Sequence, residues 1–416
     1  NPVIGPDGTV YLGTADGILR SYRPDGTASW TRQINKEHGG FYGSPVVGRD
    51  GSIYLVSSIP SMQSPNRVNE SFVHKFSPGG AWIYWKPLPR AAIYPFADGG
   101  LTNAPLNMWD VNGLEVLMVP VKYKGLGRES IDLLALAANG GVLMGRTHVN
   151  IEVYQISTLP SFGRYLPYCL ALNIWNFELG CLIPMMLSGP SFGSPASTPP
   201  PFAGAGFPMA GVTMLLNSGE GIGPRIAVTD SKNVKAMYTF SPETGFTRIF
   251  HLSTPDLNYT TTGTRVSSGV LTGTLQGRLT RTGSNLLEQP AQASLGTLTA
   301  TPTLTKESNW LVMSREGTLT RLATSGRVSV TPGGESIASA AASCTHVFVS
   351  TKAGFFTYDA NTLQQVAAVP TTGTGGLSSP VIGLKGEVYV VMGQYLFAFK
   401  SPEGTPSDSG CSGIIF

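Results

Sequence analysis

Short runs of alternating apolar and polar residues recur along the chain, and each run is followed by a tight turn. Residues 1–22, 44–58 and 379–399 share one plan: a small residue, Pro, two β-branched residues, Gly, a two-residue turn and an alternating strand. Weaker copies of this plan occupy residues 267–283, 308–326 and 344–360. Alternation with a period of two is typical of strands with one buried face. The pattern therefore predicts a chain of short strands joined by turns.

The central positions of the repeats are spaced by about one propeller blade. These positions are Tyr11, Tyr54, Leu117, Ala227, Leu271, Leu311, Phe348 and Tyr389. Five of the seven intervals between them lie between 37 and 44 residues, which is the period of a four-stranded blade. One such meander cannot bury both faces, so blades must stack until a ring closes. The sequence predicts one all-β, eight-bladed β-propeller over residues 1–416, with antiparallel blades and with seven blades as the alternative.

The third strand of each repeat is expected to be short. Five such strands are expected at residues 18–22, 278–282, 318–322, 355–358 and 395–399. Because the chain opens within the same phrase that begins its final repeat, its two ends are expected to lie side by side.

The interval between Leu117 and Ala227 is roughly seventy residues longer than one blade period, which predicts a long insertion at residues 150–211 between the third and fourth blades. Within it, residues 165–187 carry one charged side chain, Glu178. No transmembrane span is expected there, because a carboxylate at the bilayer centre costs about 2.5–3.5 kcal/mol. The segment is expected to pack over the propeller or against a protein partner. The candidates for partner contact are Trp175, Phe177, Leu182, Ile183, Met185 and Met186.

Two of the four cysteines flank the apolar part of this insertion. Cys169 and Cys181 are the preferred disulfide pair, and two buried free thiols are the alternative. Neither residue has a partner at metal-ligand spacing, so no metal site is predicted. The sequence leaves the state of Cys344 and Cys411 open.

Several features are typical of secreted proteins. Residues 188–202 are rich in Pro, Ser and Thr and are expected to be extended. They form either an O-glycosylated tract, with Ser194, Ser197 and Thr198 as acceptors, or a plain surface linker. N-glycosylation sequons begin at Asn69 and Asn258. These features predict an extracellular or cell-surface glycoprotein that passes through the secretory pathway.

The composition narrows the class of protein. Only 13% of the residues are charged and the net charge is +3, whereas Gly and Pro number 51 and 31. A typical domain has roughly 25% charged residues, and no basic run suited to nucleic acid is present. Nucleic acid is therefore excluded as a partner. Low surface charge favours a surface that is covered, by sugar or by assembly with other proteins.

The sequence offers no catalytic constellation. Its five histidines are scattered without a partner base or nucleophile at a recognisable spacing, and no cofactor site is predicted. Trp82 and Tyr84 form an alternating aromatic pair that would either contact a partner loop or a sugar, or pack between blades.

The repeat phrase resembles that of the pyrroloquinoline-quinone-like (quinoprotein-type) β-propellers. The residues that carry the resemblance are PVIGPDGTVYL at 2–12, the turn and Trp at 24–30, and the turns at 238–245 and 357–363. The resemblance implies the propeller fold over most of the chain except about 150–211. Quinone-dependent members of the family use calcium and a disulfide between adjacent cysteines, and this chain has no adjacent cysteines. It is thus similar to degenerate members that do no chemistry.

We therefore expect a non-catalytic structural or protein-interaction module, one subunit of a surface assembly or fibre that contacts protein partners or itself through residues 150–211. The alternatives are a quinoprotein-like or sugar-active enzyme that uses the central channel, and a carbohydrate-binding propeller.

Overall fold

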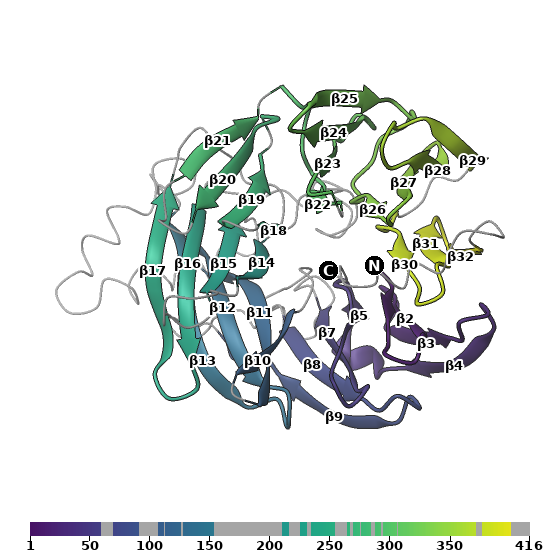
Figure 1. The fold of residues 1–416 in the computed structure, drawn as a ribbon. Helices are drawn as coiled ribbons and strands as arrows, with labels where there is room; N and C mark the ends of the chain where they lie inside the picture. The colour runs from purple at the N-terminus through teal and green to yellow at the C-terminus, as the bar shows by residue number, and fades with distance from the viewer. Residues whose placement is uncertain are drawn as a thin grey trace, which may run out of the picture.

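A computed structural model shows an all-β chain whose strands form successive antiparallel sheets. The structure describes residues 1–59, 70–90, 107–111, 113–125, 128–153, 210–215, 225–230, 234–253, 264–266, 269–274, 276–283, 288–292, 294–305, 307–371 and 377–400. In this part of the chain the strands form eight sheets, numbered 1 to 8 in chain order. Figure 1 shows the sheets following one another around a central axis, as in a β-propeller.

The first four sheets contain the N-terminal half of the strands. Sheet 1 comprises β1 (Val3–Ile4), β2 (Val10–Gly13), β3 (Ile18–Tyr22) and β4 (Ala28–Gln33). Sheet 2 comprises β5 (Gly40–Phe41), β6 (Val46–Val47), β7 (Ile53–Ile59), β8 (Glu70–Phe76) and β9 (Trp82–Pro87), and the 3₁₀ helix η1 (Lys36–His38) precedes it. Sheet 3 comprises β10 (Asn107–Val111), β11 (Leu114–Gly125), β12 (Arg128–Ala137) and β13 (Leu143–Val153). Sheet 4 comprises β14 (Ala210–Leu215), β15 (Arg225–Asp230), β16 (Val234–Ser241) and β17 (Gly245–Ser253).

The remaining sheets complete the series. Sheet 5 comprises β18 (Thr264–Val266), β19 (Gly269–Gly273), β20 (Leu279–Gly283) and β21 (Glu288–Gln292). Sheet 6 comprises β22 (Thr303–Leu304), β23 (Trp310–Met313), β24 (Leu319–Ala323) and β25 (Gly326–Val330). Sheet 7 comprises β26 (Ala341–Ala342), β27 (His346–Thr351), β28 (Gly354–Asp359) and β29 (Gln365–Pro370). The described strands of sheet 8 are β30 (Val381–Ile382), β31 (Val388–Met392) and β32 (Tyr395–Phe399).

The repeat register read from the sequence is confirmed. Seven of the eight central positions lie in the second strand of their sheet, from Tyr11 in β2 to Tyr389 in β31. The eighth, Tyr54, lies in β7 of the five-stranded sheet 2. In sheets 1, 6 and 8 this residue pairs with Val3, Thr303 and Val381 of the preceding strand. The propeller fold is thus built from one strand pattern repeated with small changes.

The hydrophobic core lies between neighbouring sheets. Buried strand residues form a separate cluster at each of six sheet pairs within the described residues: 1 and 2, 2 and 3, 3 and 4, 5 and 6, 6 and 7, and 7 and 8. At these six pairs each sheet buries one face against its neighbour, which a single sheet could not do alone.

The ring is closed where sheet 8 meets sheet 1. The Tyr389 hydroxyl donates to the carbonyl oxygen of Pro24 at 2.6 Å, and the backbone N–H of Ser379 donates to Oδ1 of Asn1 at 2.9 Å. Figure 1 likewise places the N-terminus beside β30. The first and last sheets therefore lie side by side, whereas the C-terminal end of the chain lies outside the described residues.

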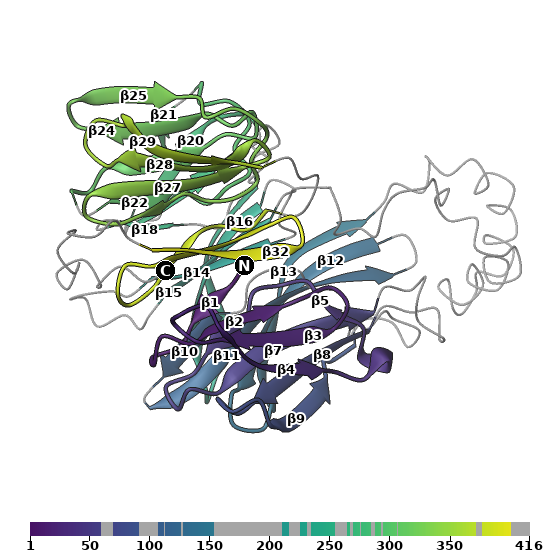
Figure 2. The same ribbon diagram turned by 90° about the vertical axis from the view of Figure 1, so that its right-hand side faces the viewer.

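Two faces of the ring can be told apart by the turns they carry. β13 ends at Val153, which pairs with Arg128 beside the β11–β12 hairpin, and β14 begins at Ala210, which pairs with Asp230 beside the β15–β16 turn. Residues 154–209 therefore leave and rejoin the described sheets on one face, which we call the insertion face. Figure 2 shows β12 and β13 extending beyond the other sheets on this side. The β3–β4 turn and its equivalents lie on the opposite face.

Candidate functional site

The outermost strand of sheet 2 carries an aromatic surface. β9 contains Trp82, Ile83 and Trp85, and these side chains are 40%, 53% and 44% exposed. We call these three residues the aromatic patch. Exposed apolar side chains gathered on one strand are typical of protein contact sites.

A β-bulge determines which way these side chains point. Tyr84 pairs with Lys75 and Trp82 pairs with Phe76, so Ile83 is an extra residue in β9. The bulge breaks the alternation: Trp82 and Trp85 both lie against His38, with ring centroids at 5.7 and 4.3 Å. Trp82 and Tyr84, which alternate in the sequence, thus face different neighbours.

Tyr84 points to sheet 3. Its hydroxyl donates to the carbonyl oxygen of Ala138 at 2.9 Å, and its ring packs on the core between sheets 2 and 3. Trp30 occupies the equivalent position of sheet 1, because it pairs with Ser21 just before the same bulge. Its Nε1–H donates to the carbonyl oxygen of Pro78 in sheet 2 at 3.1 Å. This position therefore joins each of these sheets to the next one.

Two buried histidines support the aromatic patch from beneath. His38 ends η1 and His74 lies in β8, with ring centroids 5.5 Å apart. His74 is fully buried, and its Nε2 is 2.7 Å from Oγ of Ser57. Neither Nδ1 atom has a hydrogen-bond partner in the described part of the chain. We call His38, His74, Phe72, Trp82 and Trp85 the histidine–aromatic cluster.

Both histidines are held in the neutral form. Burial lowers the pKa of His74 to about 3, and the neighbouring His38 adds to this shift. Burial also lowers the pKa of His38. A cationic imidazolium would lack water here, and at His38 burial outweighs the attraction of the neighbouring Glu37, so the charged form is disfavoured at both residues.

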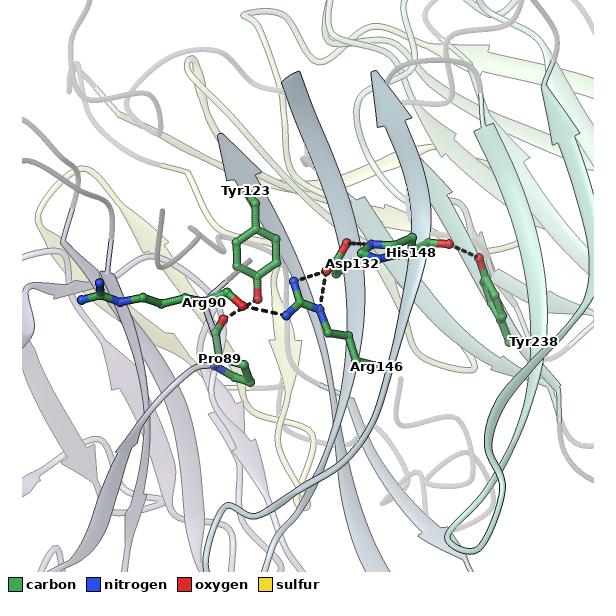
Figure 3. Close-up of polar contacts among 7 residues, drawn as sticks. All are labelled: Pro89, Arg90, Tyr123, Asp132, Arg146, His148 and Tyr238. Carbon is green, nitrogen blue, oxygen red and sulfur yellow. Dashed lines mark hydrogen bonds and ion pairs between the residues drawn. The ribbon is translucent and has the colours of Figure 1, made fainter. Parts of the chain in front are cut away.

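A second group of polar side chains surrounds a buried carboxylate in sheet 3, near the insertion face (Figure 3). Asp132 is fully buried in β12. Its Oδ2 lies 2.6 Å from Nε and 2.5 Å from Nη2 of Arg146, and its Oδ1 lies 2.7 Å from Nδ1 of His148. Both carboxylate oxygens are therefore paired with donors from β13, which is the condition for burying a charge.

The same network connects three sheets. Nη1 of Arg146 donates to the carbonyl oxygen of Arg90 at 2.7 Å, and the Tyr123 hydroxyl donates to that of Pro89 at 2.7 Å. Pro89 and Arg90 lie two and three residues after the end of β9 of sheet 2 and contact sheet 3 through these bonds. From sheet 4, the Tyr238 hydroxyl donates to the carbonyl oxygen of His148 at 3.1 Å. We call Asp132 and its partners the charged network.

The arrangement at Asp132 is suited to structural pairing. An Asp–His pair can orient a general base, but here Arg146 takes one carboxylate oxygen with two nitrogen atoms and stacks on the Tyr123 ring at 4.9 Å. No group of three or more His, Cys, Asp or Glu side chains is placed to hold a metal ion among the described residues.

Most residues singled out from the sequence lie outside the described residues. They are Asn69, Cys169, Trp175, Phe177, Cys181, Leu182, Ile183, Met185, Met186, Ser194, Ser197, Thr198, Asn258 and Cys411. Trp82 and Tyr84 are described, and Cys344 is disulfide-bonded. No helix in the described part of the chain is long and apolar enough to cross a membrane.

The sequence analysis missed the charged network. The one available signal was a single carboxylate, Asp132, inside the apolar run from Ile131 to Leu136. A charged residue in a strand that is buried on both faces requires a partner. The identity of that partner depends on the pairing of Asp132 with His148 across a bulge.

Comparison with known proteins identifies the fold alone. No protein-family model and no curated protein matches the sequence. Among solved structures, BamB from Moraxella catarrhalis superposes with a TM-score of 0.57 at 10% identity, over 97% of this chain and 95% of that one. The computationally designed Ika8 protein superposes with a TM-score of 0.54 at 10% identity, over 94% and 91%. The chain therefore has the architecture of a β-propeller.

Proposed function

We propose that this protein is a non-catalytic interaction propeller whose aromatic patch binds a protein partner. The observation that carries the proposal is the exposure of Trp82, Ile83 and Trp85 side by side on an outermost strand. Tryptophan is enriched among the residues that dominate binding energy at protein interfaces. The cluster beneath the patch holds these rings in place before binding, which lowers the entropic cost of association.

We propose further that the chain works outside the reducing cytoplasm, at the cell surface or in the extracellular space. The disulfide bond of Cys344 supports this location, because structural disulfides persist mainly in oxidising compartments. Glycosylation at Asn69, Asn258 and the 188–202 tract belongs to the same proposal.

We also propose that the chain is a degenerate member of the pyrroloquinoline-quinone-like propellers. The support is the repeat phrase, which recurs in the strand register of sheets 1, 2 and 8. In this proposal Asp132, His148 and Arg146 stabilise the ring and do no chemistry. A quinone absorbance band, or calcium-dependent dye reduction by the purified native protein, would instead support the enzyme alternative.

Site-specific photo-cross-linking tests the binding surface. A benzophenone amino acid replaces Ile83, which is 53% exposed, and as a matched control it replaces Val366 of β29, which is 54% exposed. In cells that produce the native protein, we expect a protein conjugate from position 83 and none from position 366. Equal conjugates from both positions, or none from position 83, would contradict the proposal. Binding of the purified chain to a glycan array would favour the carbohydrate-binding alternative.

A further inference from the structure

The disulfide bond of Cys344 has three candidate partners. The chain contains four cysteines, and Cys344 is disulfide-bonded in the turn between β26 and β27 of sheet 7. Cys169, Cys181 and Cys411 lie outside the described residues. The strand topology distinguishes between them, because it determines the face of the ring from which each segment starts.

Cys344 lies on the face opposite the insertion. Ala342 pairs with Val347, so the turn that holds Cys344 follows the end of β26. The backbone N–H of Ala360 donates to the carbonyl oxygen of Thr345 at 2.9 Å, which places this turn beside the β28–β29 turn. That turn is the equivalent of the β3–β4 turn in sheet 1.

The chain leaves sheet 8 on the same face. Phe399 at the end of β32 pairs with Val388 at the start of β31, and Ala398 lies next to Gly26 of the β3–β4 turn. Sheet 8 is also the immediate neighbour of sheet 7, since the Phe355 and Phe399 rings stack with centroids 4.5 Å apart. The twelve residues from Phe399 to Cys411 can span about 40 Å when extended, and they start on the face that holds Cys344.

Cys169 and Cys181 lie in a segment that is attached to the opposite face of the ring. Residues 154–209 join Val153 and Ala210 on the insertion face of sheets 3 and 4. In Figure 1, β13 and β14 lie across the ring from β26 and β27. Cys169 and Cys181 would have to reach Cys344 from the opposite face of the ring, whereas the segment with Cys411 starts on the same face as Cys344.

We propose that Cys411 is the disulfide partner of Cys344. The bond forms by thiol–disulfide exchange with a disulfide oxidant: one cysteine thiolate attacks the oxidant, the second thiolate displaces it, and the oxidant leaves as two thiols with the two electrons and two protons. The covalent loop encloses β27 to β32 and holds the last sheet against sheet 7. This pairing is independent of the aromatic patch, so a different partner for Cys344 would leave the proposed function unaffected, whereas a free Cys344 thiol would remove the support for the proposed location but not for the binding surface.

Tryptic mapping without reduction reads the pairing directly. Cleavage after Arg164, Arg225, Arg327, Lys352 and Lys400 places Cys344 in peptide 328–352, Cys411 in 401–416, and Cys169 with Cys181 in 165–225. From the native full chain, alkylated before digestion, we expect 328–352 joined to 401–416, and loss of that mass upon reduction. Peptide 328–352 joined to 165–225, or recovered in alkylated form, would overturn the proposal.

Serine variants provide a second measurement. Cys344→Ser and Cys411→Ser should lower the midpoint of denaturant unfolding equally, and the double variant should lower it no further, because either change removes the same bond. The matched control is Cys169→Ser, which should leave the 328–352 to 401–416 pair intact. An unchanged midpoint for Cys411→Ser, or additive losses, would contradict the pairing.

Discussion

The histidine–aromatic cluster and the charged network lie in neighbouring sheets and each contain a histidine, but His74 is fully buried whereas the His148 side chain is 38% exposed. His74 is surrounded by aromatic rings and has one hydroxyl partner, Ser57. His148 contacts the carboxylate of Asp132, whose charge is shared with Arg146. The first region stabilises the fold only while its histidines are neutral. The second depends on keeping opposite charges together, so the two regions should fail under different perturbations.

The largest effect is expected from removing the cation of the charged network. Arg146→Met keeps much of the apolar stem but leaves the buried Asp132 carboxylate with His148 alone. Breaking one partner of a buried ion pair costs about 3–5 kcal/mol. The free energy of unfolding, measured by urea titration at pH 7, should fall by this amount.

A double variant provides the control for this change. Asp132→Asn combined with Arg146→Met removes both charges, so its loss should be smaller than the sum of the two single losses. Additive losses, or a near-neutral Arg146→Met, would show that the network does not act as a pair.

Acid should act on the histidine–aromatic cluster with a smaller effect. The pKa of His74 is lowered to about 3 in the folded chain, and an unfolded histidine has a pKa of about 6.5. The unfolded state therefore binds the proton first, and stability that is complete above about pH 6.5 is lost as the pH falls toward 3. At pH 5 the loss from His74 is about 2 kcal/mol, and His38 acts in the same direction.

Two substitutions separate this cause from general acid unfolding. His74→Phe replaces the imidazole by a ring suited to Phe41, Phe76 and Trp82, so the difference in unfolding free energy between pH 7 and pH 5 should shrink. His346→Gln in sheet 7 leaves both buried histidines in place and should retain the full difference. If His74→Phe keeps the same pH dependence as the unmodified chain, the cluster does not sense acid.

The sequence predicted the repeated fold well, but it predicted the histidine–aromatic cluster and the charged network poorly. The repeat placed all eight central residues in the correct strand, and the third strand of sheet 1 agrees with the expected residues 18–22. These features depend on local alternation and turns. The orientation of Trp82 and Tyr84 depends on a bulge, and the contact of His38 with His74 depends on how η1 packs on β8. Such non-local pairings leave no periodic signal in a single sequence.

The smallest effect is expected from a change in β9, the strand between the histidine–aromatic cluster and the charged network. Tyr84 is on the side of β9 that faces sheet 3, and its hydroxyl donates to Ala138. Tyr84→Phe removes that hydrogen bond and leaves a carbonyl oxygen unpaired, which should lower the unfolding free energy by about 1–2 kcal/mol.

Because Trp82 and Trp85 face the other way, the cross-link from position 83 and the pH dependence of stability should both persist. Trp82→Ala is the matched comparison: it should abolish the cross-link while the Tyr84–Ala138 bond remains. Loss of the cross-link in Tyr84→Phe would show that β9 does not keep its two sides separate.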